Sequence, residues 1–410
     1  MKKYDVVIIG GGPAGLFSAI QCASCGLSVA LLEKNISFGK KLLISGSGKC
    51  NLTQVGEIEA FIHHYGTSSN FVKPCLYAFS NDSLRKFLHK NKLSTVSLEN
   101  GKVFPQSMKA IDVLNVFENV CRQKGVDLLT KMDVKRISTN EGIFETLTEC
   151  STFYSKYVVI STGGVSYPQT GSTGDGHIFA KNFGHKIRPT KFALAPLFIK
   201  SFELADYSGL SFEDLCFTHW RDGKKVGAYS GDVLVTHRGI SGPGVMDNSR
   251  YMVRGDVVKI NFLNGTVEDS RGALVKLFNN GGKKLVRSVV NELNLPKRLV
   301  DYFLSTAGIS HELKCAELKK ATRSKLLLLL TEYEMEIKEV GNALTAMATA
   351  GGVSLKEVNP KTMESRKVDG LYFAGEVLDV DGDTGGYNIQ VAVSMGYVVG
   401  ESIGKREAVL

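Results

Sequence analysis

The stretch DVVIIGGGPAG at residues 5–15 decides the fold. Residues 4–9, YDVVII, form an apolar run rich in β-branched residues, which is typical of a buried parallel strand. A helical pattern follows the glycines until Gly26, and LSVALLEK at 27–34 predicts a second strand that ends at Glu33. Strand, glycine turn, helix and strand together predict a βαβ unit.

The turn matches the dinucleotide fingerprint G-x-G-x-x-G through Gly10, Gly12 and Gly15. The first glycine permits a tight turn, the second lets the backbone approach a pyrophosphate, and the third lets the helix pack on the strand. Glu33 follows at the end of the second strand, where a carboxylate accepts hydrogen bonds from ribose hydroxyls and repels a 2′-phosphate. The turn therefore predicts a site for FAD or NAD.

The C-terminal segment favours a flavin. Residues 371–376, LYFAGE, read as a strand that ends on Gly375 and Glu376, and TGGYN at 384–388 opens a final helix. Such a tail can return to the first domain and place an acid beside the ribityl chain and a helix N-terminus beside the flavin pyrimidine. A purely structural alternative is a helix capped by Asp383 or Thr384.

Five motifs occur in the same order as in a known flavoprotein family. They are DVVIIGGGPAG at 5–15, KLLISGSGKCNLT at 41–53, STGGVSYPQTGSTGDGH at 161–177, THRGISGPGV at 236–245 and the glycine-rich tail at 349–400. Through them the sequence resembles the YhiN/BaiN-like family of NAD(P)/FAD-dependent oxidoreductases, which includes aminoacetone-oxidase-like flavoproteins. The resemblance implies non-covalent FAD in a Rossmann-type domain that is interrupted by a β-barrel-like domain and a helical insertion.

The periodicity of the chain supports the same organisation. Short alternating runs separated by glycines indicate an antiparallel β domain from about 192 to 262, and a lysine-rich helical pattern follows it. We expect an α/β fold with three parts. Their ranges are 1–190 plus 355–410 for a Rossmann-type FAD-binding domain, 191–266 plus 335–354 for a β-barrel-like substrate domain, and 267–334 for a small helical subdomain. Within the first part we expect helices at 81–91 and 112–124 and strands at 126–129 and 157–162.

The loop SGSGKCNLT at 45–53 superficially resembles the end of a phosphate-binding P-loop. A Walker A loop requires a glycine where this chain has Leu43 and a serine or threonine where it has Cys50, so an NTPase is not expected. Because the loop follows Glu33 by about a dozen residues, it can run back along the cofactor towards the flavin ring. We interpret Cys50 as a packing or cofactor-contacting residue rather than a redox thiol.

The predicted FAD contacts combine these segments. Thr162 and Gly163 are included because STGG at 161–164 resembles the second glycine site by which such flavoproteins close over the dinucleotide. The full set is Gly10, Gly12, Pro13, Ala14, Gly15, Glu33, Lys34, Lys41, Ser45, Gly46, Gly48, Cys50, Asn51, Val134, Thr162, Gly163, Gly375, Glu376, Gly386, Tyr387, Asn388 and Ile389.

Two residues are candidates for substrate chemistry. His237 lies in the β domain, which we expect to form the far wall of the flavin cavity, and an imidazole suits proton donation when a hydride adds to a polarised double bond. A structural histidine is the alternative. Tyr167 either faces the active site or anchors its own loop through its hydroxyl, and Asp175 is expected to cap the helix that starts at Gly176. No spacing typical of a metal site is present, so no metal is predicted.

Composition sets limits on partners and location. The net charge of +9 comes from scattered lysine and arginine pairs rather than a basic run interleaved with aromatics, so nucleic acid is not the expected partner. Eight irregularly spaced cysteines and the lack of a secretory segment predict reduced thiols in a cytoplasmic protein, and Cys22 and Cys25 read as small packing residues. No apolar run is long enough to cross a membrane, and the oligomeric state is left open.

We therefore expect an FAD-dependent oxidoreductase that transfers hydride to or from a small organic substrate, with NAD(P)H as a transient reductant. No second G-x-G-x-x-G marks a separate nicotinamide domain. Two alternatives remain open at this point. One is a flavoprotein that acts on or binds RNA, and the other is a flavin-binding protein without turnover.

Overall fold

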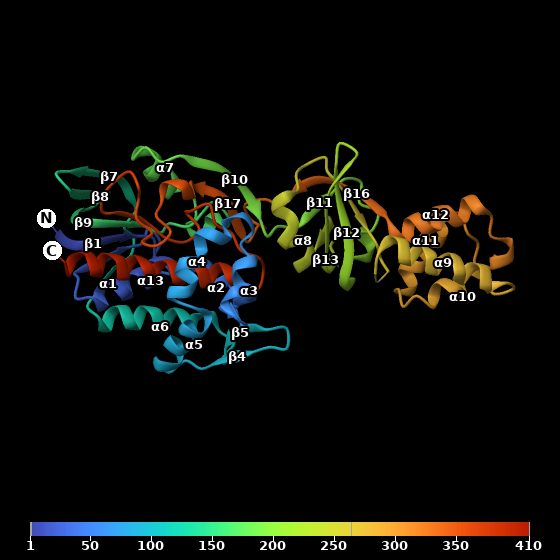
Figure 1. Cartoon of the computed structure of the whole chain (residues 1–410), viewed down its shortest axis with the longest axis horizontal. Helices are drawn as coiled ribbons and strands as arrows, with labels where there is room; N and C mark the ends of the chain where they lie inside the picture. Colours follow the sequence, from blue (N-terminus) through green and yellow to red (C-terminus); the bar gives the residue numbers. More distant parts are fainter. Residues whose placement is uncertain (1, 264, 410) are drawn as a thin grey trace. The chain divides into compact units, whose positions relative to one another are not determined.

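The computed structural model describes residues 2–263 and 265–409. They form two compact units (Figure 1). Unit 1 contains the residues up to Ala193 and those from Ala343 onwards, and unit 2 contains Leu194–Asn342.

Unit 1 is built on a sheet with strand order β6-β2-β1-β9-β8-β7, in which β18 also pairs with β9. β6, β2, β1, β9 and β18 run parallel, as expected for a Rossmann-type domain, whereas β7 and β8 add an antiparallel extension. Their bounds are β1 Lys2–Ile9, β2 Val29–Leu32, β6 Asp127–Leu129, β7 Val134–Asn140, β8 Ile143–Thr148, β9 Thr152–Ile160 and β18 Leu371–Phe373. The C-terminal halves of β1 and β9 and all of β2 are buried, which explains their continuous apolar sequence.

Unit 1 contains helices that the sequence patterns predicted and others that they did not, such as α2, α3 and α4. The helix expected at 81–91 is α5, and the one expected at 112–124 is α6. The helices are α1 Pro13–Ser24, α2 Lys40–Ile44, α3 Ile58–His63, α4 Ser69–Ala78, α5 Asn81–Lys90, α6 Ala110–Gln123, α7 Asp175–Asn182 and α13 Tyr387–Glu407. Two small sheets complete the unit, formed by β3 Thr53–Gln54, β4 Thr95–Ser97 and β5 Lys102–Pro105, and by β10 Ile187–Ala193 and β17 Ala348–Val353.

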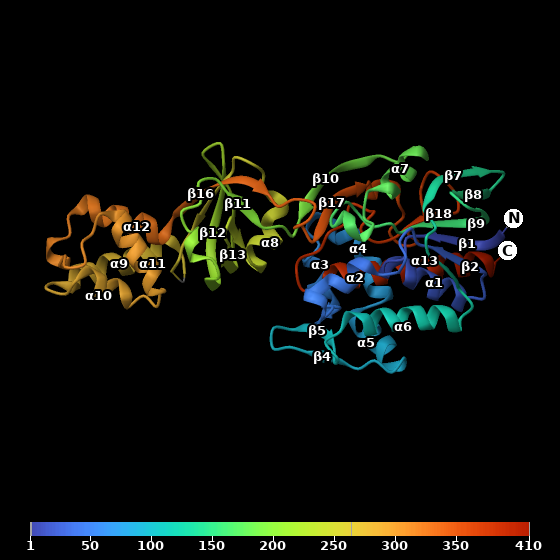
Figure 2. The same ribbon diagram turned by 180° about the vertical axis from the view of Figure 1, so that it is seen from behind.

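The two ends of the chain pack together through α1 and α13, which lie side by side in Figures 1 and 2. Three glycines spaced four residues apart on α13 make the close approach possible. A Cβ atom on Gly396 would lie 2.5 Å from the Ala14 carbonyl oxygen, and one on Gly400 would lie 2.5 Å from Cβ of Gln21. On Gly404 it would lie 2.4 Å from Cys25 Sγ, so this cysteine packs against the last helix.

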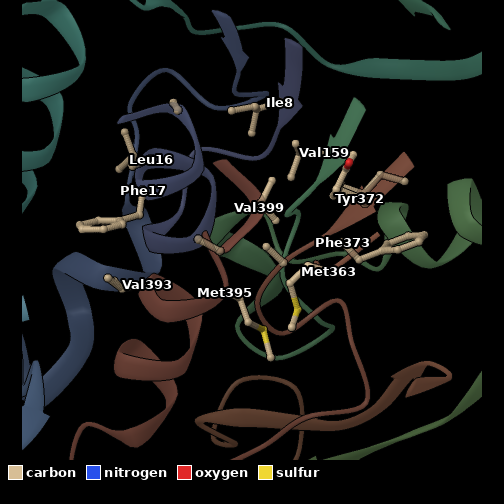
Figure 3. Packing of buried hydrophobic residues seen from close by; sticks show 14 of the residues in the cluster. Ile8, Leu16, Phe17, Val159, Met363, Tyr372, Phe373, Val393, Met395 and Val399 are labelled. Carbon is tan, nitrogen blue, oxygen red and sulfur yellow. The ribbon is translucent and has the colours of Figure 1, made fainter. Parts of the chain in front are cut away.

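The core of unit 1 joins the sheet to these two helices. Figure 3 shows Ile8 and Val159 from neighbouring strands together with Phe17 of α1 and Met395 and Val399 of α13. All five side chains are buried, so the C-terminal helix is an integral part of the first domain rather than an appendage.

Unit 2 contains a closed barrel with strand order β11-β14-β13-β12-β15-β16, which confirms the β-barrel-like part of the predicted fold. The strands are β11 Leu197–Ile199, β12 Ser211–Arg221, β13 Lys224–Val235, β14 Gly239–Ser241, β15 Val257–Ile260 and β16 Tyr333–Val340, and α8 is Pro243–Asn248. Between β15 and β16 the chain forms α9 Val267–Gly281, α10 Val286–Asn291, α11 Lys297–Ala307 and α12 Lys320–Thr331. These helices share one core with the barrel, in which the Phe262 ring lies 5.3 Å from Phe303 and 5.8 Å from Tyr333.

The boundary between the units differs from the expected ranges at two places. Residues 191–193 and 343–354 were expected in the β domain but lie in unit 1. The reason is that β17 pairs antiparallel with β10, for example at Phe192 and Thr349, and a two-stranded pairing over distant segments leaves no local sequence signal.

A buried ion pair joins β12 to the residue that precedes β15. Asp256 accepts two hydrogen bonds from the Arg221 guanidinium, one from the Val253 amide, and contacts His219 Nε2 at 2.6 Å. Burial opposes ionisation of this carboxyl, but the hydrogen bonds from Arg221, Val253 and His219 outweigh it and lower the pKa of Asp256 to about 2.

We expect Asp256→Asn to lower the free energy of unfolding of unit 2 by about 1–3 kcal/mol at pH 7, because buried donors lose a charged acceptor. Since the folded pKa is depressed, this stabilisation is present above the ordinary pKa of 3.8 and is lost as the pH falls towards 2. Urea unfolding at pH 7, 4 and 3 measures both effects. The exposed Asp206→Asn is the control, and equal pH dependence of wild type and Asp256→Asn would contradict the assignment.

Candidate functional site

The glycine turn lies between β1 and α1 and has the geometry that a dinucleotide requires. Gly10 has φ of +104°, and a Cβ atom there would lie 2.5 Å from the Ser161 carbonyl oxygen. A Cβ atom on Gly15 would lie 2.0 Å from the carbonyl oxygen of Gly10, so neither position accepts a side chain. Gly12 differs from both because nothing lies within 4 Å of its Cβ position. The turn therefore closes on itself at Gly10 and Gly15 and opens to a ligand at Gly12.

The first turn of α1 adds to this opening. Gly12 is its N-cap with no side-chain hydrogen bond, Pro13 is its first residue, and no acid lies in the first turn. The unsatisfied N–H groups and the positive end of the helix dipole are thus left for an anionic group such as a pyrophosphate. Ala14, the next residue, is buried.

Glu33 follows β2 and is tied to the glycine turn. Its Oε2 accepts a hydrogen bond from the Gly11 amide at 2.8 Å, and its Oε1 accepts from the Asn35 amide and side chain. The carboxylate is almost fully buried. It therefore fixes the shape of the turn, and Oε2, which accepts one hydrogen bond, retains capacity to accept another from a ribose hydroxyl.

The Lys34 side chain binds residues at the start of α7. Its Nζ donates to Asp175 and to the Thr173 hydroxyl. The expectation that Asp175 caps a helix at Gly176 is wrong, because Asp175 is the first residue of α7 and its side chain makes no cap hydrogen bond. The salt bridge with Lys34 holds the carboxylate away from the helix amides.

Glu376 lies at the centre of a polar network after β18. Lys41 Nζ donates to its Oε2 at 2.8 Å, the Ser166 hydroxyl donates to its Oε1 at 3.0 Å, and the Thr349 amide donates to the same oxygen at 2.8 Å. Lys41 also contacts the Ser166 hydroxyl at 2.7 Å. The network brings two predicted cofactor residues, Lys41 and Glu376, together with Ser166 and Thr349, which sequence reasoning missed although both lie in glycine-rich motifs.

The loop at 45–53 has a backbone that few residues can adopt. Gly46 and Ser47 lie in the left-handed region, as do Gly48 and Cys50. A Cβ atom on Gly46 would lie 2.9 Å from the Asn51 amide nitrogen, so the loop folds tightly onto its own end. Ser45 is half-buried, whereas residues 46–49 are exposed.

Cys50 is fully buried at the end of this loop, and burial raises the pKa of its thiol to about 12. We expect iodoacetamide at pH 8 to modify Cys50 at least about a thousandfold more slowly than the exposed Cys150, since the thiolate is the reactive form. Peptide mass spectrometry of the native protein measures the two rates. Cys50→Ala should keep the fold and any bound flavin, and equal labelling of the two cysteines would contradict a packing role.

The N-terminus of α13 meets the loop. A Cβ atom on Gly386 would lie 2.5 Å from the amide nitrogen of Thr53, so the start of the last helix touches the end of the SGSGKCNLT segment. Asn388 forms two hydrogen bonds with the backbone of Gly382. The N-cap residue of α13 is Gly386, and not the Asp383 or Thr384 of the purely structural alternative.

The remaining predicted FAD contacts differ in their surroundings. Thr162 is the second residue after β9, and its hydroxyl is buried without a partner among the described residues. Gly163 is left-handed, and Gly375 is buried beside Ala14. Val134 is buried as the first residue of β7, and the structure assigns its side chain to the core.

The two catalytic candidates lie in different units. Tyr167 is half-buried and left-handed, its amide donates to the Ala343 carbonyl, and its hydroxyl makes no hydrogen bond with the described residues. His237 is exposed on the turn between β13 and β14 in unit 2. A further pair that sequence reasoning missed is His64 and Asp383, which lie beside the first residue of α13.

FAD fits the residues of unit 1. The open Cβ position of Gly12, the acid-free N-terminus of α1 and the unpartnered Thr162 hydroxyl supply what a diphosphate and ribityl chain need. Among residues 2–263 and 265–409, no group of three or more histidines, cysteines or acids could hold a metal ion. In the same part of the chain, no helix is long and apolar enough to cross a membrane.

The model of the HI0933-like protein Rossmann domain matches residues 4–402. The chain belongs to this family. A relative in Haemophilus influenzae, named ribosomal RNA dihydrouridine synthase, is 32% identical over 99% of this chain and 100% of the relative. The 3-dehydro-bile acid delta(4,6)-reductase of Clostridium scindens is 30% identical over 97% of this chain and 98% of the relative.

Solved structures share the fold of this family member. A flavocytochrome c3 fumarate reductase superposes with a TM-score of 0.52 at 17% identity, covering 98% of this chain and 78% of that one. The 3-ketosteroid delta1-dehydrogenase of Sterolibacterium denitrificans gives a TM-score of 0.53 at 11% identity, covering 99% and 100%. The chain is therefore an FAD-dependent oxidoreductase.

Proposed function

We propose that this enzyme reduces a carbon–carbon double bond conjugated to a carbonyl group, with FAD as the hydride carrier. The names of the two relatives describe this same chemistry. A dihydrouridine synthase saturates the uracil ring beside a carbonyl, and a 3-dehydro-bile acid delta(4,6)-reductase saturates bonds conjugated to a 3-oxo group. The proposed substrate is a small organic molecule of the second kind.

The observation that carries the proposal is the meeting of Gly386 with Thr53 in unit 1. This contact joins the N-terminus of the 21-residue helix α13 to the end of the loop at 45–53, in which several residues have a left-handed backbone conformation. Both segments are the proposed neighbours of the flavin ring. The positive end of α13 then stabilises negative charge on the ring, and the small residues of the loop let the backbone lie against it.

The rest of the proposed cofactor site follows the chain of unit 1. The amides at Gly12–Gly15 hold the diphosphate, Glu33 accepts from the ribose hydroxyls, and Glu376 accepts from the ribityl chain. Lys34, Lys41, Thr162, Gly163 and Asn388 line the same path. Bound FAD supplies two electrons as a hydride, and the protein orients the cofactor and excludes water.

NAD(P)H is the proposed reductant of the flavin, and it visits the flavin without a domain of its own. His237 and Tyr167 are proposed to contact the substrate. His237→Ala should then retain FAD but lose turnover, whereas unchanged turnover would remove His237 from the site.

The experiment begins with the FAD content of the purified protein. Anaerobic mixing with NADH or NADPH should bleach the flavin, and adding 2-cyclohexen-1-one should restore its absorbance with formation of cyclohexanone. Cyclohexanone itself, which lacks the double bond, is the matched control and should leave the flavin reduced. A reduced flavin that no unsaturated ketone reoxidises, including a 3-oxo-4-ene steroid, rejects the proposal.

A second candidate function, action on RNA, is favoured by the charge of the helices in unit 2. Residues 267–331 hold twelve lysines and arginines against six acids, although the whole chain has a net charge of only +9. Lys319→Glu with Lys320→Glu, both at exposed positions, should then weaken RNA binding and reduce its dependence on salt. RNA affinity equal to that of wild type at low salt would reject this function.

A further inference from the structure

His64 is held in one orientation at the start of the C-terminal helix. Its Nδ1 lies 2.9 Å from Oδ2 of Asp383, and its ring stacks on Tyr387 with centroids 4.1 Å apart and an angle of 19° between the planes. The Asp383 amide also donates to the His64 carbonyl oxygen at 3.0 Å. Two separate contacts with Asp383 and one with Tyr387 therefore fix both the backbone and the ring.

The opposite side of the ring remains accessible. The His64 side chain is 39% exposed, whereas Tyr387 and Tyr65 are buried. Because the carboxylate occupies Nδ1, Nε2 is the nitrogen left to meet a ligand. The charged and titratable groups that face the ring are the Asp383 carboxylate before α13, the Tyr387 ring on α13, and Tyr65 beside it, whose hydroxyl donates to the Tyr387 carbonyl.

The place of this pair in the fold gives it a function. Tyr387 is the first residue of α13 and follows Gly386, which touches Thr53 at the end of the SGSGKCNLT loop. These two segments are the proposed neighbours of the flavin ring. His64 thus belongs to the same unit as the cofactor turn, and its position does not depend on how unit 2 is placed.

We propose that His64 is the proton donor of the reaction and that Asp383 is its positioning residue. This inference rests on the proposed reduction of a conjugated double bond. The hydride from the reduced flavin forms a C–H bond at the β-carbon as the π bond breaks. The proton on Nε2 forms the second C–H bond at the α-carbon. Oxidised flavin and neutral imidazole remain, and water returns the proton to His64.

Asp383 gives the imidazole the orientation that a proton donor needs. Its hydrogen bond with Nδ1 directs Nε2 outwards. Stacking on Tyr387 restricts rotation of the ring, which keeps the donor at a constant angle.

The first test separates the two half-reactions of the holoenzyme. His64→Gln should retain FAD and should be reduced by NADH or NADPH at the wild-type rate, because hydride arrival needs no proton from His64. Its reoxidation by 2-cyclohexen-1-one should be about 10²-fold slower or more, with little change in KM. His63→Gln, at the exposed neighbouring position, is the matched control and should behave as wild type.

Asp383→Asn should slow the same half-reaction about tenfold and change its dependence on pH. If Asp383 were only structural, Asp383→Asn would lower the flavin content, and the molecules that keep their flavin would have the wild-type pH profile. Equal reoxidation rates for wild type and His64→Gln overturn the inference.

The second test asks whether His64 lies beside the flavin ring, and it needs no substrate. A protonatable group beside the ring couples to flavin reduction, so the dependence of the flavin midpoint potential on pH should be the same in wild type and in His63→Gln. It should differ in His64→Gln. If it does not differ there, His64 does not lie beside the flavin and the inference fails. If the wild-type flavin is instead not reoxidised by the enone, the proposed function fails while the potential still decides the position of His64.

Discussion

Replacing Gly12 by aspartate is expected to produce a folded protein that no longer holds FAD. Nothing lies within 4 Å of the Cβ position of Gly12, and its φ of −81° and ψ of −176° suit any residue. Aspartate at an N-cap also favours the helix by a few tenths of a kcal/mol. The same carboxylate would lie where the diphosphate is proposed to bind, and repulsion of about 3–4 kcal/mol corresponds to at least about a hundredfold weaker binding.

Two kinds of measurement test the loss of FAD and the retained stability. Flavin absorbance of the purified protein and equilibrium dialysis with FAD measure binding, and thermal unfolding of the apoprotein measures stability. Gly272→Asp is the matched control, because Gly272 lies in α9 of unit 2 and its Cβ position is equally open. It should leave FAD content unchanged. A yellow Gly12→Asp protein with wild-type affinity would place the cofactor elsewhere and remove the basis of the proposed function.

The second large effect concerns the contact between the two ends of the chain. Gly396→Ala should lower the free energy of unfolding of unit 1 by about 2–3 kcal/mol, because its Cβ atom would lie 2.5 Å from the Ala14 carbonyl oxygen and 2.9 Å from the Ser18 amide nitrogen. Both are backbone atoms of α1, which cannot rotate away. Separation of the helices also moves the N-terminus of α13 from the loop, so FAD content should fall with stability.

Gly404→Ala provides the graded comparison on the same helix. Its Cβ atom would meet the Cys25 side chain, which can move, and so its effect on the midpoint of thermal unfolding should be much smaller. Differential scanning calorimetry of both variants measures the difference. Equal midpoints for the two variants would mean that the packing of α13 on α1 is looser than the structure has it.

Much of the cofactor-binding unit was predictable because its signals are local. A buried strand, glycines at three fixed positions and an acid at the end of the next strand identify a Rossmann-type turn without any tertiary information, and Gly10 and Gly15 have the tight surroundings expected of them. The helix at 81–91 and the strand at 157–162 were equally evident from periodicity. The predicted FAD contacts and the catalytic role of His237 stay predictions.

Where sequence reasoning was wrong, a distant partner decided the outcome. Asp175 was expected to cap α7, but it is the first residue of that helix, and Lys34, more than a hundred residues earlier, binds its carboxylate. Asp383 was considered as a helix cap, whereas it pairs with His64. A polar side chain near a helix start has several possible partners, and the nearest charge in space selects among them.

The sequence alone determined that this chain has a dinucleotide turn, that a strand and a glycine pair let its last helix return to the first domain, and that a β domain with a helical insertion separates the two. Only the tertiary structure decided that Ser166 and Thr349 hold Glu376, that three glycines seat α13 on α1, and that His64 stacks on Tyr387. The physical reason is the distance along the chain over which each interaction acts. Backbone conformation and apolar periodicity depend on a few neighbouring residues, so the sequence shows them directly. Hydrogen bonds and ring contacts can join residues hundreds of positions apart, and only packing brings those residues together.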